Sequence, residues 1–171
     1  MSARGALALV GVVGCGLILA ASASSSRKAA ASTCGARVHQ EPNPVLGTLS
    51  GGSWVAGSPR RSGLVGYLFG GEVVDGRFAV YAGGTNPGTR TDEKILWVVP
   101  RQKRVGPRLA ISGRRDGSTT VTYRRRLAEA GGAPHHIFPS ILDLPTPGCW
   151  KLTLRTAKIS ATLTVLAQVA H

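Results

Sequence analysis

The stretch that decides the fold is residues 144–167, LPTPGCWKLTLRTAKISATLTVLA. A cysteine and a tryptophan follow its Pro-Gly pair. Apolar and polar side chains then alternate in two runs, the first from Trp150 and the second from Ile159. Since successive side chains of a strand point to opposite faces, this period of two predicts two β-strands. One face carries Trp150, Leu152, Leu154, Ile159, Ala161, Leu163 and Val165, and the other carries Lys151, Thr153, Arg155, Ser160, Thr162 and Thr164. We predict a closing hairpin that turns at residues 156–158.

Shorter runs of the same kind precede this hairpin. Turn residues separate them, among them Asp75-Gly76 and Asp116-Gly117. Regularly spaced short strands predict an all-β domain, and a Pro-Gly pair before an aromatic strand start is typical of immunoglobulin-like modules. We therefore predict an immunoglobulin-like antiparallel β-sandwich. The predicted strands are residues 64–70, 77–83, 94–100, 108–115, 119–125, 138–144, 150–156 and 159–167, with a short strand around Trp54. The predicted core contains Leu96, Trp97, Ile111, Trp150, Leu152, Leu154, Leu163 and Val165.

The first residues have the form of an export signal. A basic start at Arg4 precedes an uncharged run over residues 5–21, and residues 21–23 read Ala-Ser-Ala, which signal peptidase cuts. We predict a signal peptide over residues 1–23, a flexible leader over 24–33 and one domain over 34–171. Two alternatives stay open. The residues before Cys15 resemble a lipobox, which would end a lipoprotein signal at residue 14 and acylate Cys15; an uncut membrane anchor is the other.

Either cleavage leaves Cys34 and Cys149 as the two cysteines of the domain. An even pair in an oxidising compartment indicates a disulfide, and two unpaired thiols are the alternative. By strand parity Cys149 points away from Trp150, toward the face of Lys151. We expect it to fasten the irregular front of the domain, around Cys34, to the last hairpin.

Four segments together resemble a family of small exported bacterial proteins. They are SGLVGYLFGG, KILWVVP, LAISGRRDG and FPSILDLPTPGCWKLTLR. Members of this family share an early Cys, a Lys-x-Leu-Trp strand, a Gly-Arg-Arg-x-Asp-Gly turn and a closing Pro-x-x-Gly-Cys-Trp hairpin. The turn at residues 113–117 is one residue shorter here. The resemblance implies the fold, export and the cysteine pair, and it implies no reaction.

The charge is strongly positive, with 21 Lys and Arg against 8 Asp and Glu and a net charge of +13. A hairpin closed by Asp116-Gly117 would bring Arg114, Arg115, Arg124, Arg125 and Arg126 near one sheet edge. Such an edge attracts anionic polymers by charge, although charged residues also protect a sheet edge from pairing and can reflect genome composition. Export and the scarcity of aromatic residues oppose a specific nucleic-acid role.

Catalytic chemistry has little support in this sequence. The acidic residues fall mostly in predicted turns, where Asp bonds its own backbone, and no nucleophile or phosphate-loop motif is present. The candidate metal ligands are His135 and His136, which need a third ligand from His39, an acid or His171. We predict a non-catalytic exported or envelope-associated binding module without a cofactor. Its partner would be a protein or an anionic envelope polymer; the alternative is an extracytoplasmic metal-dependent hydrolase centred on the His pair.

Overall fold

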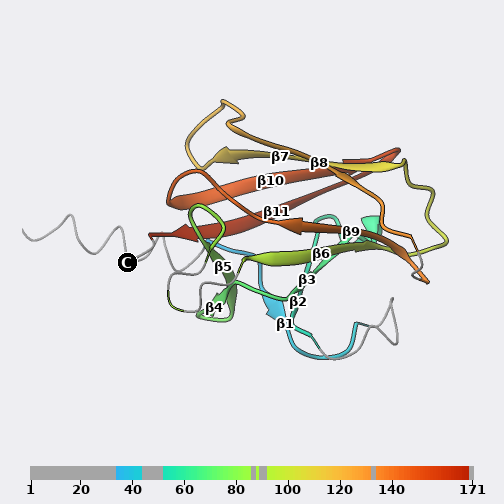
Figure 1. Ribbon diagram of the computed structural model, residues 1–171, viewed down its shortest axis with the longest axis horizontal. Coiled ribbons are helices and arrows are strands. Elements are labelled where there is room, and N and C mark those ends of the chain that lie inside the picture. The colour runs from blue at the N-terminus through green and yellow to red at the C-terminus, as the bar shows by residue number, and fades with distance from the viewer. Residues whose placement is uncertain (1–33, 44–51, 86–87, 89–91, 132–133, 170–171) are drawn as a thin grey trace, which may run out of the picture.

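Two β-sheets stack face to face in the computed structural model, which describes residues 34–43, 52–85, 88, 92–131 and 134–169. One sheet has five strands in the order β1 (Val38–His39), β2 (Trp54–Ala56), β3 (Val65–Leu68), β6 (Lys94–Val99) and β9 (His136–Ile141). The other has six, in the order β4 (Glu72–Val74), β5 (Arg77–Tyr81), β11 (Ile159–Gln168), β10 (Gly148–Thr156), β7 (Arg108–Arg115) and β8 (Tyr123–Ala128). Figure 1 shows the two layers, and one short 3-10 helix, η1 (Arg60–Ser62), follows β2. The predicted all-β sandwich is confirmed.

The closing hairpin forms as its alternation predicts. β10 and β11 are antiparallel, with Trp150 opposite Val165 and Leu152 opposite Leu163. Thr156 pairs with Ile159, so the turn consists of residues 157 and 158, and Ala157 takes a positive φ of 47°. All four paired apolar side chains are buried between the sheets. Burial of these apolar side chains fixes the register of β10 and β11, the longest strand pair, because a slip of one residue would turn them toward solvent.

The core between the sheets contains the predicted residues with one exception. Trp97, Ile111, Trp150, Leu152, Leu154, Leu163 and Val165 belong to the main cluster, together with Phe78 and Phe138. The prediction was wrong for Leu96, which is only partly buried. By strand parity Leu96 opposes Trp97, so it packs on the other face of β6 against a second apolar cluster of Trp54, Val65, Tyr67 and Val98.

Several strand boundaries differ from the predicted ones. β8 begins at Tyr123 rather than 119, because the hydroxyl of Ser118 accepts from the Thr120 amide and holds these residues in a turn. β9 covers residues 136–141 rather than 138–144. β4 was not predicted, since only residues 72–74 are extended between two turns. The purely antiparallel expectation also fails at one pair, β5 with β11, which is parallel.

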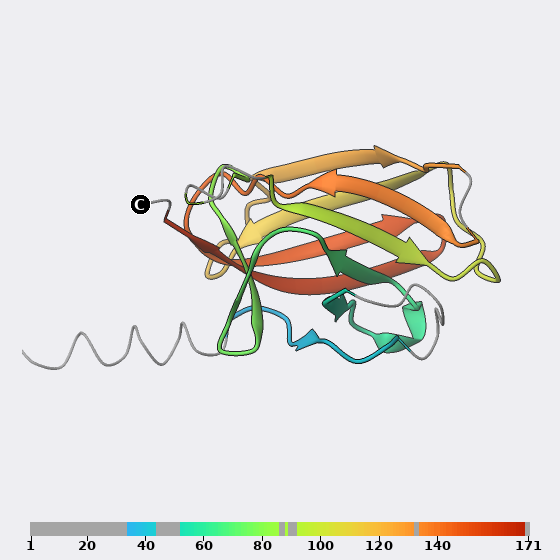
Figure 2. The same ribbon diagram turned by 60° about the horizontal axis from the view of Figure 1, so that its bottom comes forward.

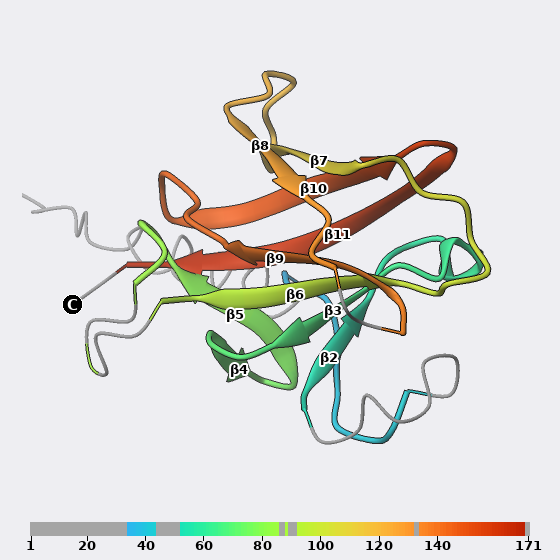
Figure 3. The same ribbon diagram turned by 45° about the vertical axis from the view of Figure 1, so that its right-hand side comes forward.

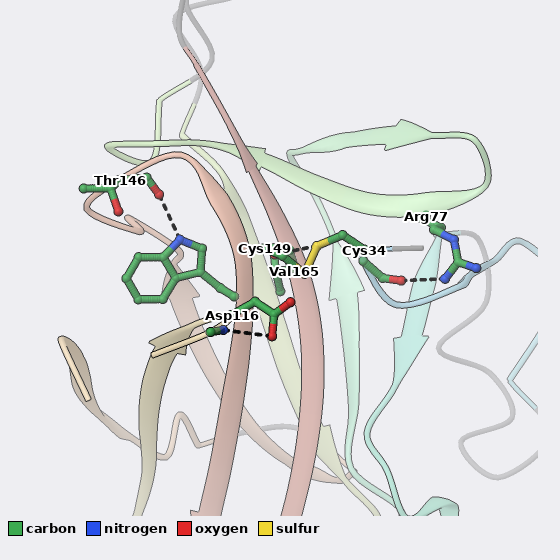
Figure 4. Close-up of a disulfide and its surroundings, with 9 residues drawn as sticks. Cys34, Arg77, Asp116, Thr146, Cys149 and Val165 are labelled. Carbon is green, nitrogen blue, oxygen red and sulfur yellow. Dashed lines mark hydrogen bonds between the residues drawn. A yellow bond between two sulfur atoms is a disulfide. The ribbon is translucent and has the colours of Figure 1, made fainter. Parts of the chain in front are cut away.

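The disulfide joins Cys34 to Cys149, as predicted, with their Cα atoms 5.7 Å apart (Figure 4). Neither cysteine belongs to the two apolar clusters. The segment after Cys34 lies along the edge of β11, where the Ala36 amide donates to the Thr164 carbonyl at 2.7 Å. The disulfide thus holds the segment that begins at Cys34 against the last strand, β11. Within the described residues, no helix has the length and apolarity needed to cross a membrane.

Candidate anion-binding face

The exposed surface of the six-stranded sheet is built by the outward side chains of β10, β7 and β8. These three strands are neighbours in that order, as Figure 3 shows at the top of the view. Because Leu152 and Leu154 point into the core, Lys151 and Arg155 point outward. Arg114 lies directly opposite Lys151 in the β7–β10 register, and it is exposed as well.

β8 continues this surface at the edge of the sheet. Arg124 pairs with Ser112 and Arg126 with Ala110, and both arginines are exposed. Arg108, at the start of β7, shares the outward parity of Ala110 and Ser112. We call these outward cations the basic face; they are Arg108, Arg114, Arg124, Arg126, Lys151 and Arg155.

The outward positions of β7, β8 and β10 carry no carboxylate. The side chains between the cations are small or bear hydroxyls, as at Ala110, Ser112 and Thr153. None of the six cations forms an ion pair with a described residue. Like charges opposite one another in a sheet are destabilising, and Arg114 faces Lys151 in this way. A charge arrangement that opposes folding is therefore concentrated on one surface, where a bound anion would relieve it.

The spacing of the basic face follows from sheet geometry. Outward side chains repeat every two residues, about 6.6 to 6.8 Å along a strand, and neighbouring strands lie about 4.8 Å apart. Arg126, Ala110 and Arg155 form one row across the three strands, and Arg124, Ser112 and Thr153 form the next. Every row carries at least one cation, so an extended chain of anions meets a positive charge at each step.

The structure does not bring the five predicted arginines to one surface. Arg114, Arg124 and Arg126 lie on the basic face, but Arg125 has the opposite parity and is bonded to Asp143 at the sheet edge. The hydroxyl of Tyr123 donates to the same carboxylate at 3.2 Å. Burial raises the pKa of Tyr123, and the neighbouring Arg125 opposes that shift. Arg115 pairs with Trp150, on the core-facing parity, and packs over Gly148 at the end of β10.

Sequence reasoning missed three members of the basic face: Arg108, Lys151 and Arg155. The alternation of the closing hairpin had already placed Lys151 and Arg155 on the outward side of their strand. Lys151 and Arg155 share one surface with the arginines only because β10 lies beside β7, a strand from a much earlier part of the sequence. Alternation within one strand carries no information about which strand lies next to it.

The histidines lie apart from the basic face or have other partners. His136 Nδ1 lies 2.7 Å from a Glu129 carboxylate oxygen, and His39 makes the same contact with Glu41. His135 is half-buried, and its Nδ1 has no hydrogen-bond partner in the part of the chain that the structure describes. In the described part of the chain, no three His, Cys, Asp or Glu residues come together in a way that would hold a metal ion. His171 and Cys15 lie outside the described residues.

One carboxyl group is fully buried. Glu93 is 0% exposed, and neither of its carboxyl oxygens has a hydrogen-bond partner among the described residues. Burial raises the pKa of Glu93 to about 7, the nearby backbone amide of Tyr81 opposes this shift, and the charge of Glu72 adds to it. Glu72 is itself bonded to the Tyr81 hydroxyl at 2.6 Å and to Gln168. These contacts describe a neutral buried acid next to a hydrogen-bonded carboxylate.

Comparisons of the chain with protein families, with curated proteins and with solved structures found no match.

Proposed function

We propose that the protein is a non-catalytic binding module that docks an anionic polymer of the cell envelope through the basic face. One observation carries the proposal: six exposed cations on three adjacent strands, with no carboxylate at the outward positions of those strands. Such a surface attracts polyanions over distances comparable to the Debye length, about 8 to 10 Å at moderate ionic strength. The net charge of +13 over the full sequence adds a long-range attraction that does not depend on where the charges lie.

The composition of the face favours a partner recognised by its charges. Base and sugar rings are commonly held by stacking on exposed aromatic side chains. The outward positions of β7, β8 and β10 hold no aromatic residue, whereas Trp97 and Trp150 lie in the core. An extended polymer with charges along its backbone needs only cations at regular steps and hydroxyl donors between them.

Export is part of the proposal, with either cleavage before Ser24 or lipidation of Cys15. The disulfide between Cys34 and Cys149 fits an oxidising compartment outside the cytoplasm. A partner in the envelope would then be within reach of the basic face, and a lipid anchor would hold the module close to it.

The test is retention of the full domain on an immobilised polyanion, eluted with a salt gradient. We expect the Arg114→Ser, Arg124→Ser, Arg126→Ser triple variant to elute at clearly lower salt than the wild type. The matched control is Arg61→Ser, Arg101→Ser, Arg104→Ser, which removes the same charge from exposed positions in η1 and the loop after β6. Each lost phosphate contact should lower the slope of log affinity against log salt by about 0.7 to 0.9.

Equal elution of the two triple variants would refute the basic face as the docking surface. In that case net charge alone, and not its placement on β7 and β8, would account for retention.

A further inference from the structure

A hollow of about 250 Å³ opens at the margin of the basic face, beside β11. Its lining includes Lys151 from β10, Thr162 and Thr164 from β11, and Arg37 and Ser58 from two segments that lie alongside β11. Lys151 belongs to the basic face, so the hollow and the face are continuous. The hollow adds to the face a concave place with cations on two of its sides.

The walls of the hollow are fixed by backbone hydrogen bonds. The Ser58 amide donates to the Thr162 carbonyl at 2.8 Å, and the Thr162 amide donates back to the Ser58 carbonyl at 2.7 Å. On the other side, the bond from Ala36 to Thr164 places Arg37 beside the strand, one residue further along. Figure 4 shows the disulfide that anchors this second wall, with the sulfur of Cys34 against the Val165 carbonyl and Arg77 bonded to the backbone next to it.

The polar groups of the hollow suit an anion that accepts from several directions. Arg37 and Lys151 supply cationic donors from the two sides of β11, and Ser58 and Thr164 add hydroxyls to the lining. The Thr162 hydroxyl is bonded to the Ser58 carbonyl at 3.4 Å, so it is the less available donor. The described residues that line the hollow include no carboxylate. A tetrahedral phosphate presents oxygens to all these sides at once, whereas a planar carboxylate presents only two.

We propose that this hollow is a phosphate subsite, in which Arg37 and Lys151 hold one phosphate group of the polymer that the basic face docks. The inference rests on the proposed function and narrows it to a phosphate-bearing polymer. The flat part of the face binds a polyanion at any register, because its cations repeat from row to row. A walled subsite at one margin gives the polymer a fixed point, so that the chain runs from the hollow onto the basic face and then along its strands, from the row of Lys151 toward the row of Arg155.

The subsite is tested by titrating the full domain with inorganic phosphate and recording backbone amide chemical shifts. We expect saturable shifts centred on residues 37, 58, 151 and 164, and smaller, unsaturated shifts with acetate at equal ionic strength. Arg37→Ser should weaken phosphate binding several-fold. The control Arg104→Ser removes an equal charge from the loop after β6 and should leave phosphate binding close to that of the wild type.

Absence of saturable shifts at the hollow, or equal effects of Arg37→Ser and Arg104→Ser, would overturn the subsite. This failure is distinguishable from failure of the proposed function. If the Arg114, Arg124 and Arg126 variant still loses retention on the polyanion while phosphate leaves the hollow unperturbed, the docking face stands without the subsite. A wild type retained equally well by carboxylate and phosphate polymers of similar charge density would also contradict the narrowing to phosphate.

Discussion

Glu93 is the residue whose position is hardest to reconcile with a stable sandwich. An ionised carboxylate buried without a hydrogen bond is costly, so burial favours the neutral form and raises the pKa of Glu93 to about 7. The surroundings allow no easy escape to solvent. Its amide donates to the Gly84 carbonyl at 2.9 Å, and its carboxyl group lies against Gly71, where an added Cβ would come within 3.0 Å of the carboxyl oxygen. The proton on Glu93 is therefore part of what stabilises the junction of β5 and β6.

This position predicts that stability falls as pH rises through neutrality. Since the folded-state pKa of Glu93 is raised from 4.5 to about 7, its contribution is complete below pH 4.5 and is lost as pH rises through 7. Glu93→Gln keeps the shape of the neutral acid and cannot ionise. We expect the variant to match the wild type near pH 4.5 and to exceed its unfolding free energy by roughly 1 to 3 kcal/mol at pH 8. Chemical denaturation at several pH values measures the difference.

Asp75→Asn is the matched control, because it removes one negative charge from an exposed turn whose positive φ of 51° asparagine tolerates. It should keep the pH dependence of the wild type. A Glu93→Gln variant with the same pH dependence as the wild type would show that Glu93 is ionised or hydrated in the folded protein.

Among single elements, β8 is one of the two edge strands of the six-stranded sheet and pairs only with β7. A side chain from outside that sheet also binds it. Asp143, just after β9, binds Arg125 and accepts from the Tyr123 hydroxyl. The link closes the open side of the sandwich between β8 and β9, which Figure 2 shows as neighbouring strands of the two layers. The position of Arg124 and Arg126 on the basic face thus depends on Asp143.

Asp143→Asn should loosen β8 selectively. The pair is partly exposed, so we expect a loss of only about 0.5 to 1 kcal/mol of global stability. Amide hydrogen exchange should speed up in β8 more than in β10, because β10 is held between β11 and β7. Asp116→Asn, in the β7–β8 turn, is the control, since its side chain keeps an acceptor for the Gly117 amide. Uniform acceleration in both strands would contradict the local role of Asp143.

Elements were predictable from sequence where both faces of a strand have distinct neighbours. β10 and β11 alternate clearly because one side meets the core and the other meets water. β6 was predicted as a strand, but the side of it that faces the core was not. Trp97 faces the core and Leu96 faces a second apolar cluster, so both sides of β6 are apolar and the sequence does not alternate. β4 is too short to show a period at all. The basic face was predictable only in part, for a related reason. Strand parity shows which side chains of one strand point outward, but only the order of the strands in the sheet shows that those side chains lie on the same surface.

At the scale of the whole molecule, a single covalent link joins the two ends of the domain. Cys34 and Cys149 are 115 residues apart, so the disulfide closes most of the chain into one loop. Cys34 is buried and Cys149 is partly buried, but neither belongs to the two apolar clusters between and outside the sheets. The front segment, in contrast, reaches the sheet through few backbone bonds, among them the one from Ala36 to Thr164 and the one from Phe78 to the Ala36 carbonyl. The link should matter more for the unfolded chain and the front segment than for the sandwich.

Reduction should therefore destabilise the protein without abolishing the β-sandwich. Closing a loop of this length contributes about 2 to 5 kcal/mol in the chain-entropy view, and we expect the denaturation midpoint to fall accordingly while the far-UV circular dichroism stays β-type.

Intact mass after alkylation of protein from its native envelope provides the chemical check. Two thiols should react only after reduction, and the mass identifies whether the chain begins at Ser24 or at an acylated Cys15. The hollow beside β11 should lose phosphate binding on reduction while retention on a polyanion persists, because the basic face lies on strands that the core holds in place. Thiols that react in the unreduced folded protein would show that hydrogen bonds alone fix the front segment, and the hollow would then be independent of the redox state of its compartment.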